Sequence, residues 1–119
     1  MASQETSAQA GVYTVEQADA GESVFNTRCS ACHGENLEGT PGGPALVRAN
    51  FMFAFGDRTV GDLFAFMKAS MPPEAPGTLT DQQFVNIAAH LLRGNGYPAG
   101  MTALPNTPDG LSQIRIPRL

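Results

Sequence analysis

Two cysteines three residues apart, with a histidine directly after the second, constrain this chain more than any other feature. The run is Cys29-Ser30-Ala31-Cys32-His33, and it contains both cysteines of the sequence. The spacing C-x-x-C-H is typical of covalent haem attachment, because two thiols can add to the two vinyl groups of a porphyrin while the adjacent imidazole reaches the iron from one face. We therefore expect Cys29 and Cys32 to attach one haem c, and His33 to be an iron ligand.

Two other kinds of site could use the same residues. A thioredoxin-type dithiol would need a strand leading into the motif, whereas a helical pattern precedes it here. A closed zinc site would need a fourth ligand beside Cys29, Cys32 and His33, and only His90 or a carboxylate is left to supply it. Haem is favoured, and both alternatives stay open from the residues alone.

The size and charge of the chain exclude several classes of protein. A chain of 119 residues has room for one compact domain. Its net charge of -4 at pH 7 provides no phosphate-neutralising surface, so we exclude a nucleic-acid-binding protein. No run approaches the ~18 uninterrupted apolar residues that a membrane span needs. We therefore expect no nucleic-acid partner and no membrane span. The sequence leaves the oligomeric state open, with a monomer preferred.

Three capping boxes predict three helices. Each box is a threonine followed three residues later by an amide or carboxyl side chain, and apolar residues then recur at helical spacing. The predicted helices cover about residues 15–28, 60–70 and 81–93. No pattern predicts a sheet, so the predicted fold class is all-α. The boxes are Thr14 with Gln17, Thr59 with Asp62, and Thr80 with Gln83.

Glycine and proline content predicts the remaining segments. Residues 34–56 contain too many glycines and prolines for a long helix, so we expect a loop that a cofactor orders. Residues 1–11 are small and polar and are predicted to be a disordered segment outside the core. The domain then spans residues 12–94. Residues 95–119 are rich in proline and show no sustained period, which predicts an extended C-terminal tail packed on the domain.

The second iron ligand separates an electron carrier from a haem with an open position. Met71 follows the second predicted helix and precedes two prolines, which hold the backbone stiff and extended. Met67 lies on the apolar stripe of that helix and Met52 lies between two phenylalanines, so core packing is the simpler role for both. For His90, one residue off the stripe of the third helix, packing at a helix edge is simpler than ligation. We predict His33 and Met71 as the axial ligands, with Met67 as the alternative.

From Val12 to Leu92 the sequence resembles the class I cytochromes c. Gly21 and Phe25 stand eight and four residues ahead of Cys29. In that family a glycine and an aromatic residue at these positions let the first helix cross the last one at close range. The resemblance therefore implies the cytochrome c fold, in which three main helices and loops wrap around one covalently bound haem.

Two further positions extend the resemblance. Residues 43–46, Gly-Pro-Ala-Leu, are similar to the family's Gly-Pro-x-Leu segment, in which the proline carbonyl accepts a hydrogen bond from the ligand histidine. This implies that Pro44 orients His33 and that Leu46 lies against the haem. His90 falls where the family usually has an aromatic residue on the last helix.

The resemblance also implies a different partner for the haem carboxylates. Many bacterial relatives carry a tryptophan near position 55 that reaches a carboxylate, whereas this chain has Phe55 and no tryptophan. We expect Arg58 to replace it. Apolar side chains should bury the haem and, with a methionine ligand, raise its reduction potential. They are Leu46, Phe51, Phe53, Phe55, Phe64, Phe66 and Leu91.

The function that the resemblance implies is one-electron transfer without catalysis of its own. Residues 12–14, 58–63, 71–73 and 94–98 are similar to small cytochrome subunits and domains associated with quinoprotein dehydrogenases. The implied partners are a periplasmic dehydrogenase as donor and an oxidase or another protein as acceptor. The implied location is the periplasm, reached with a signal peptide absent from this sequence.

The residues also predict how the protein contacts its redox partners, and they leave one alternative to electron transfer. Because Lys68 is the only lysine, we expect a small apolar contact with redox partners and weak salt dependence. If the methionine ligand is labile or absent, the alternative is a haem enzyme or a gas-binding sensor.

Overall fold

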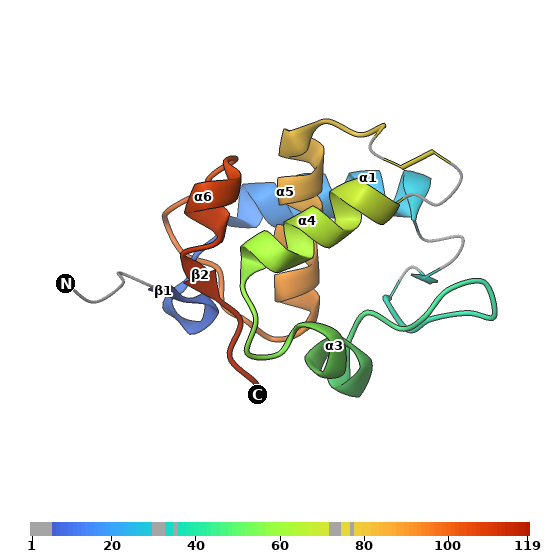
Figure 1. Ribbon diagram of the computed structural model, residues 1–119, viewed down its shortest axis with the longest axis horizontal. Helices are drawn as coiled ribbons and strands as arrows, with labels where there is room; N and C mark the ends of the chain where they lie inside the picture. The colour runs from blue at the N-terminus through green and yellow to red at the C-terminus, as the bar shows by residue number, and fades with distance from the viewer. Residues whose placement is uncertain (1–5, 30–32, 35, 72–74, 77) are drawn as a thin grey trace.

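Helices dominate the structure, and two short strands lie near its chain ends (Figure 1). The structure is a computed structural model that describes residues 6–29, 33–34, 36–71, 75–76 and 78–119. The predicted all-α class is confirmed. The elements are β1 (Thr6–Ser7), the 3-10 helix η1 (Ala8–Ala10), α1 (Val15–Arg28), α3 (Arg48–Phe55), α4 (Val60–Ser70), α5 (Asp81–Gly94), α6 (Pro108–Leu111) and β2 (Ile114–Arg115).

The three predicted helices, α1, α4 and α5, begin after the three predicted threonines. Each threonine hydroxyl accepts a hydrogen bond from the backbone N–H three residues later, and that residue's side chain accepts one from the threonine N–H. These bonds satisfy backbone donors that have no partner inside the helix. The predicted start of each helix is therefore confirmed.

The crossing of α1 and α5 lies at the centre of the fold (Figure 1). Gly21 of α1 lies against the α5 backbone, where an added Cβ atom would stand 1.8 Å from the carbonyl oxygen of Asn86. Only a residue without a side chain permits this approach. Phe25, one turn further along α1, is buried with its ring centroid 5.2 Å from that of His90 on α5. The glycine and the aromatic residue thus lie at the close crossing, as predicted.

The helix α4 packs against α5 at a second contact. Phe64 and Phe84 meet edge to face, with ring centroids 6.4 Å apart and an angle of 87° between the rings. Near the end of α4, the Lys68 ammonium lies 3.0 Å from the Asp81 carboxylate at the start of α5. Together the two contacts hold the middle and the C-terminal end of α4 close to α5.

Part of the glycine- and proline-rich segment is helical, which corrects the prediction of a loop over residues 34–56. The helix α3 contains neither glycine nor proline. Phe51 and Phe55 lie one turn apart on its buried face, with ring centroids 5.6 Å apart. The prediction was wrong here because most glycines and prolines of this segment lie within residues 34–44, so they do not disfavour a helix at residues 48–55.

The C-terminal segment belongs to the core and is not an extended cover over it. Leu104, Leu111 and Ile116 are buried, and α6 packs on α4. Its prolines break any helical period, but single apolar side chains between them still insert into the core. Periodicity could not reveal this mode of burial, because no run of residues shares one face.

Residues 6–11 also enter the fold, which corrects the prediction that they lie outside the core. β1 pairs in parallel with β2, with Thr6 opposite Ile114 and Ser7 opposite Arg115. Ala8 is buried in the core. Strands of two residues are too short to show the alternation from which strands are predicted.

Replacement of Gly21 by alanine tests the crossing. The new methyl group would overlap the α5 backbone, so we expect the free energy of unfolding of the holoprotein to fall by about 3 kcal/mol. Chemical denaturation measures this change. Ser23→Ala, on the exposed face of α1, is the control and should change stability by less than about 0.5 kcal/mol. Equal stabilities of the two variants would contradict the close approach.

Candidate cofactor site

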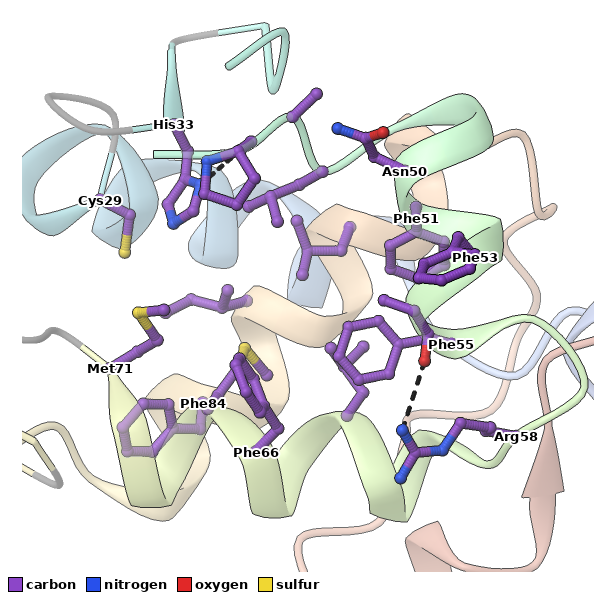
Figure 2. Close-up of a pocket in the computed structure, with 18 of the residues that line it drawn as sticks. Cys29, His33, Asn50, Phe51, Phe53, Phe55, Arg58, Phe66, Met71 and Phe84 are labelled. Carbon is purple, nitrogen blue, oxygen red and sulfur yellow. Dashed lines mark hydrogen bonds between the residues drawn. The ribbon is translucent and has the colours of Figure 1, made fainter. Parts of the chain in front are cut away.

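A cavity of about 650 Å³ lies between α1, α3, α4 and α5 (Figure 2). This volume falls within the roughly 300–1,000 Å³ that small-molecule and cofactor sites occupy. Apolar side chains form most of its described wall, and the charged and other strongly polar side chains are Arg28, His33, Asn50 and Arg58. A hollow of this kind excludes water and suits a large, mostly apolar cofactor with a few polar groups.

His33 is oriented by one hydrogen bond. Its Nδ1 lies 2.7 Å from the carbonyl oxygen of Pro44, so the bond implied by the resemblance is confirmed. A carbonyl oxygen only accepts, and therefore Nδ1 carries the proton. In the neutral ring the lone pair is then on Nε2, and Figure 2 shows the His33 ring pointing into the cavity. An imidazole held in this way is ready to bind a metal.

Cys29 reaches the same cavity from the end of α1. Its N–H donates to the carbonyl oxygen of Phe25 at 2.7 Å, which makes it the C-cap of the helix. The backbone N–H of His33 donates in turn to the carbonyl oxygen of Cys29 at 3.0 Å. Cys32 lies outside the described residues. The helix end therefore places Cys29 and His33 side by side at the cavity wall.

Two methionines line the cavity and a third does not. Met71 is half-buried just after α4, with φ -124° and ψ 144°, so the expected extended backbone is present; Pro72 and Pro73 lie outside the described residues. Met67 is buried on α4 and also lines the cavity. Met52 instead packs against the core, with its Sδ atom 3.7 Å from the Tyr97 hydroxyl.

Most of the expected apolar wall is present. Leu46, Phe51, Phe55 and Leu91 line the cavity, whereas Phe64 is not among its described lining residues and packs against Phe84, which is one of them.

Phe53 and Phe66 also line the cavity, at its edge, with 88% and 49% of their surface exposed. On α3, Phe51 and Phe55 share the inner face, and Phe53 lies half a turn away from both. The two edge phenylalanines are therefore in reach of a cofactor in the cavity, as expected.

Two polar side chains lie at the end of the cavity away from Cys29 (Figure 2). The guanidinium of Arg58 donates to the carbonyl oxygen of Ala54 at 3.3 Å, and its Nε lies 3.6 Å from the Asp62 carboxylate. Asn50 faces the cavity from α3. Sequence reasoning missed Asn50, because α3 itself was not predicted.

His90 is buried away from this cavity. Only 6% of its surface is exposed, and neither ring nitrogen has a hydrogen-bond partner among the described residues. Desolvation by burial lowers the pKa of His90; Glu22 opposes this effect and Arg93 adds to it. The imidazole thus packs against Phe25 where an aromatic residue was expected, and it is enclosed more deeply than a helix edge would be.

The residues around the cavity fit a covalently held haem. They offer an imidazole with a free Nε2, a cysteine beside it, thioether sulfur atoms, apolar walls and polar side chains at the far end. A zinc site has less support. Within the described ranges no group of three or more His, Cys, Asp or Glu side chains could hold a metal ion, and His90 is not among the described lining residues.

Fold and cavity together define a c-type cytochrome domain. The family model described as cytochrome c oxidase, cbb3-type, subunit III matches residues 16–91. This match covers more than half of the chain, so the chain belongs to that family. A c-type cytochrome domain carries covalently bound haem c.

Named relatives agree with this assignment. The cytochrome c subunit of the cytochrome bc1 complex from Mycobacterium tuberculosis and Mycobacterium bovis is 30% identical over 91 residues, which cover 76% of this chain and 31% of the relative. Subunit CcoP of the cbb3-type cytochrome c oxidase from Azospirillum brasilense is 28% identical over 80 residues, which cover 62% of this chain and 27% of the relative. The chain thus spans less than a third of the length of these relatives.

A solved structure shows the same fold. The sulfane dehydrogenase SoxCD from Paracoccus pantotrophus aligns with a TM-score of 0.61 and 24% identity, over 84% of this chain and 53% of that chain. Among the described residues, no helix is both long enough and apolar enough to cross a membrane.

His90→Phe should stabilise the holoprotein. Phenylalanine fills a similar space and removes two buried nitrogens that lack a partner, so we expect the free energy of unfolding near pH 7 to rise by about 1 kcal/mol. Denaturant unfolding of both proteins measures the difference. A phenylalanine variant no more stable than the unsubstituted protein would contradict the expected penalty of two unpaired nitrogens.

The free energy of unfolding should depend more strongly on pH in the unsubstituted protein than in His90→Phe. In the unfolded chain His90 has the ordinary histidine pKa of 6.5, whereas burial lowers its pKa in the folded chain. The linked stability is therefore fully present above that value and is lost as the pH falls below it. The loss of stability between about pH 7.5 and about pH 5 should be smaller in His90→Phe. Identical losses would contradict the lowered pKa.

Proposed function

We propose that this domain transfers single electrons through a haem attached at Cys29 and Cys32, with His33 and Met71 as the axial ligands. The observation that carries the proposal is the hydrogen bond from His33 Nδ1 to Pro44, which leaves Nε2 for a metal inside an apolar cavity. Bound haem supplies one-electron chemistry at its iron. With both His33 and Met71 bound to the iron, no position would be open to a substrate.

Met71 is favoured over Met67 by its backbone and its position. Figure 2 shows Met71 across the cavity from His33. Its extended backbone lies outside the helix, so its side chain can be presented to the cavity without competing with helix packing. Met67 is one of the buried residues of the α4 stripe and packs in the core. Packing is therefore the simpler role for Met67.

The chain supplies the environment of the haem as well as its ligands. Phe51, Phe55 and Leu91 exclude water from the cavity, and a low-dielectric surrounding disfavours the extra charge of the ferric state. Arg58 and Asn50, at the end away from Cys29, are the partners that we propose for the haem carboxylates. This combination predicts a relatively oxidising carrier.

Respiratory proteins are the partners that the relatives favour. By name, the relatives are a subunit of a bc1 complex and a subunit of a cbb3-type oxidase. We propose a periplasmic location, a dehydrogenase or bc1-type donor, and an oxidase as acceptor. The likeness to subunits of quinoprotein dehydrogenases stays a prediction about the donor.

Visible spectra of two alanine variants test the ligand assignment. In the unsubstituted protein and in Met67→Ala, carbon monoxide should leave the spectrum of the reduced protein unchanged. In Met71→Ala the sixth position opens, and carbon monoxide should shift the spectrum. Met67→Ala should instead lower the free energy of unfolding by about 2–5 kcal/mol.

Two outcomes would contradict the proposal. Carbon monoxide binding by Met67→Ala but not by Met71→Ala would transfer the ligand role to Met67. Carbon monoxide binding by the unsubstituted protein would favour a gas-binding sensor or a haem enzyme. Met52→Ala, which removes a methionine outside the described cavity wall, is the matched control.

Docking should depend only weakly on salt. The Lys68 ammonium already pairs with Asp81 at 3.0 Å, and Arg58 lies near Asp62. Oxidation of the reduced protein by a purified cbb3-type oxidase should change in rate by less than about threefold between ~0.01 M and ~0.15 M salt. A steep fall in rate would show that charge steers the encounter.

A further inference from the structure

The backbone around Arg58 is held by a segment that is absent from the described cavity wall. The N–H of Asp57 donates to the carbonyl oxygen of Ile116 at 2.7 Å, and the N–H of Ile116 donates to the carbonyl oxygen of Arg58 at 2.7 Å. Thr59 and Arg115 form an antiparallel bridge next to these bonds. The turn between α3 and α4 is therefore tied to residues 115–116 on both sides of the Arg58 side chain.

Asp57 also ties this turn to the C-terminal segment through two ion pairs, which we call the clamp. Its carboxylate lies 3.0 Å from Arg118 Nε and 3.4 Å from Arg115 Nη2. Its φ of 65° is in the left-handed region, which aspartate and asparagine tolerate better than most residues. Together the two ion pairs and the left-handed conformation of Asp57 fix the backbone direction at the next residue, Arg58.

The clamping segment is itself anchored in the core. Ile116 is fully buried, and the hydroxyl of Tyr97 donates to the carbonyl oxygen of Pro117. The Tyr13 hydroxyl donates to the Tyr97 carbonyl oxygen at 2.6 Å, which links this anchor to the start of α1. The segment is therefore a rigid support and not a loose end.

We infer that Asp57 and the segment 114–118 are positioning elements for Arg58, and that they set the reduction potential of the haem through it. The inference rests on the proposed function, in which the Arg58 guanidinium lies at the carboxylate edge of the haem. A cation held there disfavours the ferric state and raises the potential. The same cation released to solvent is screened and loses this effect.

The sign of the change separates positioning from simple charge. Removal of the negative charge of Asp57 acts by itself to raise the potential. Release of Arg58 from its place acts in the opposite direction. Asp57→Asn, whose side chain keeps the left-handed backbone accessible, should therefore lower the midpoint potential of the holoprotein if positioning dominates.

A double-mutant cycle tests the inference by redox titration of the holoproteins. Arg58→Gln should lower the midpoint potential, and Asp57→Asn should lower it too. In the Arg58→Gln background, Asp57→Asn should no longer lower it. Arg118→Gln, with and without Arg58→Gln, repeats the cycle from the other ion-pair partner of Asp57. Loss of the Arg118 charge lowers the potential by itself in both backgrounds, so only the part of its effect that disappears without Arg58 reports positioning. The control is Asp19→Asn, which removes the same charge from an ion pair with Arg93 and should not lower the potential.

Each result decides a different claim. If Arg58→Gln lowers the potential but the effects of Asp57→Asn and Arg118→Gln persist undiminished without Arg58, the positioning role is overturned and the proposed function stands. If Arg58→Gln leaves the potential unchanged, the contact between Arg58 and the haem carboxylates fails, and the inference fails with it. Loss of the Asp57→Asn effect in the double variant supports the inference.

Discussion

Contact between two helix backbones at Gly21 is the constraint on which the rest of the structure depends. It brings α1 directly against α5 at Asn86. The end of α1 carries Cys29, and α5 supplies Ile87 and Leu91 to the cavity wall. Because one helix carries the attachment point and the other carries part of the wall, their separation sets the width of the cavity. A larger side chain at position 21 would therefore act on the cofactor site without touching it.

Within the cavity, polarity is concentrated at a few positions. The Pro44 carbonyl decides which nitrogen of His33 carries a proton, so one backbone oxygen determines the chemistry that the imidazole offers. Arg58 and Asn50 lie at the other end, and mainly apolar residues lie between. A large cofactor with polar groups on one edge and reactive groups on another has only one orientation that satisfies such a cavity.

Local signals predicted the parts of this structure that local chemistry determines. The capping threonines located α1, α4 and α5, because a cap needs only residues within one turn. The attachment motif located Cys29 and His33 for the same reason, and the resemblance supplied Pro44. Local signals could not predict which side chains are buried, because burial depends on neighbouring elements. His90 is enclosed because of how the neighbouring helices are placed, and single apolar side chains of the C-terminal segment are buried between its prolines.

The parallel pairing of β1 and β2 makes the two outer segments of the described chain a single unit. β1 is bonded to β2, and β2 leads directly into the residues bonded beside Arg58. A force applied to the chain at Thr6 would therefore reach the far end of the cavity through two short strands. A tether attached at that end of the domain is mechanically connected to its redox centre, although the two are far apart in sequence.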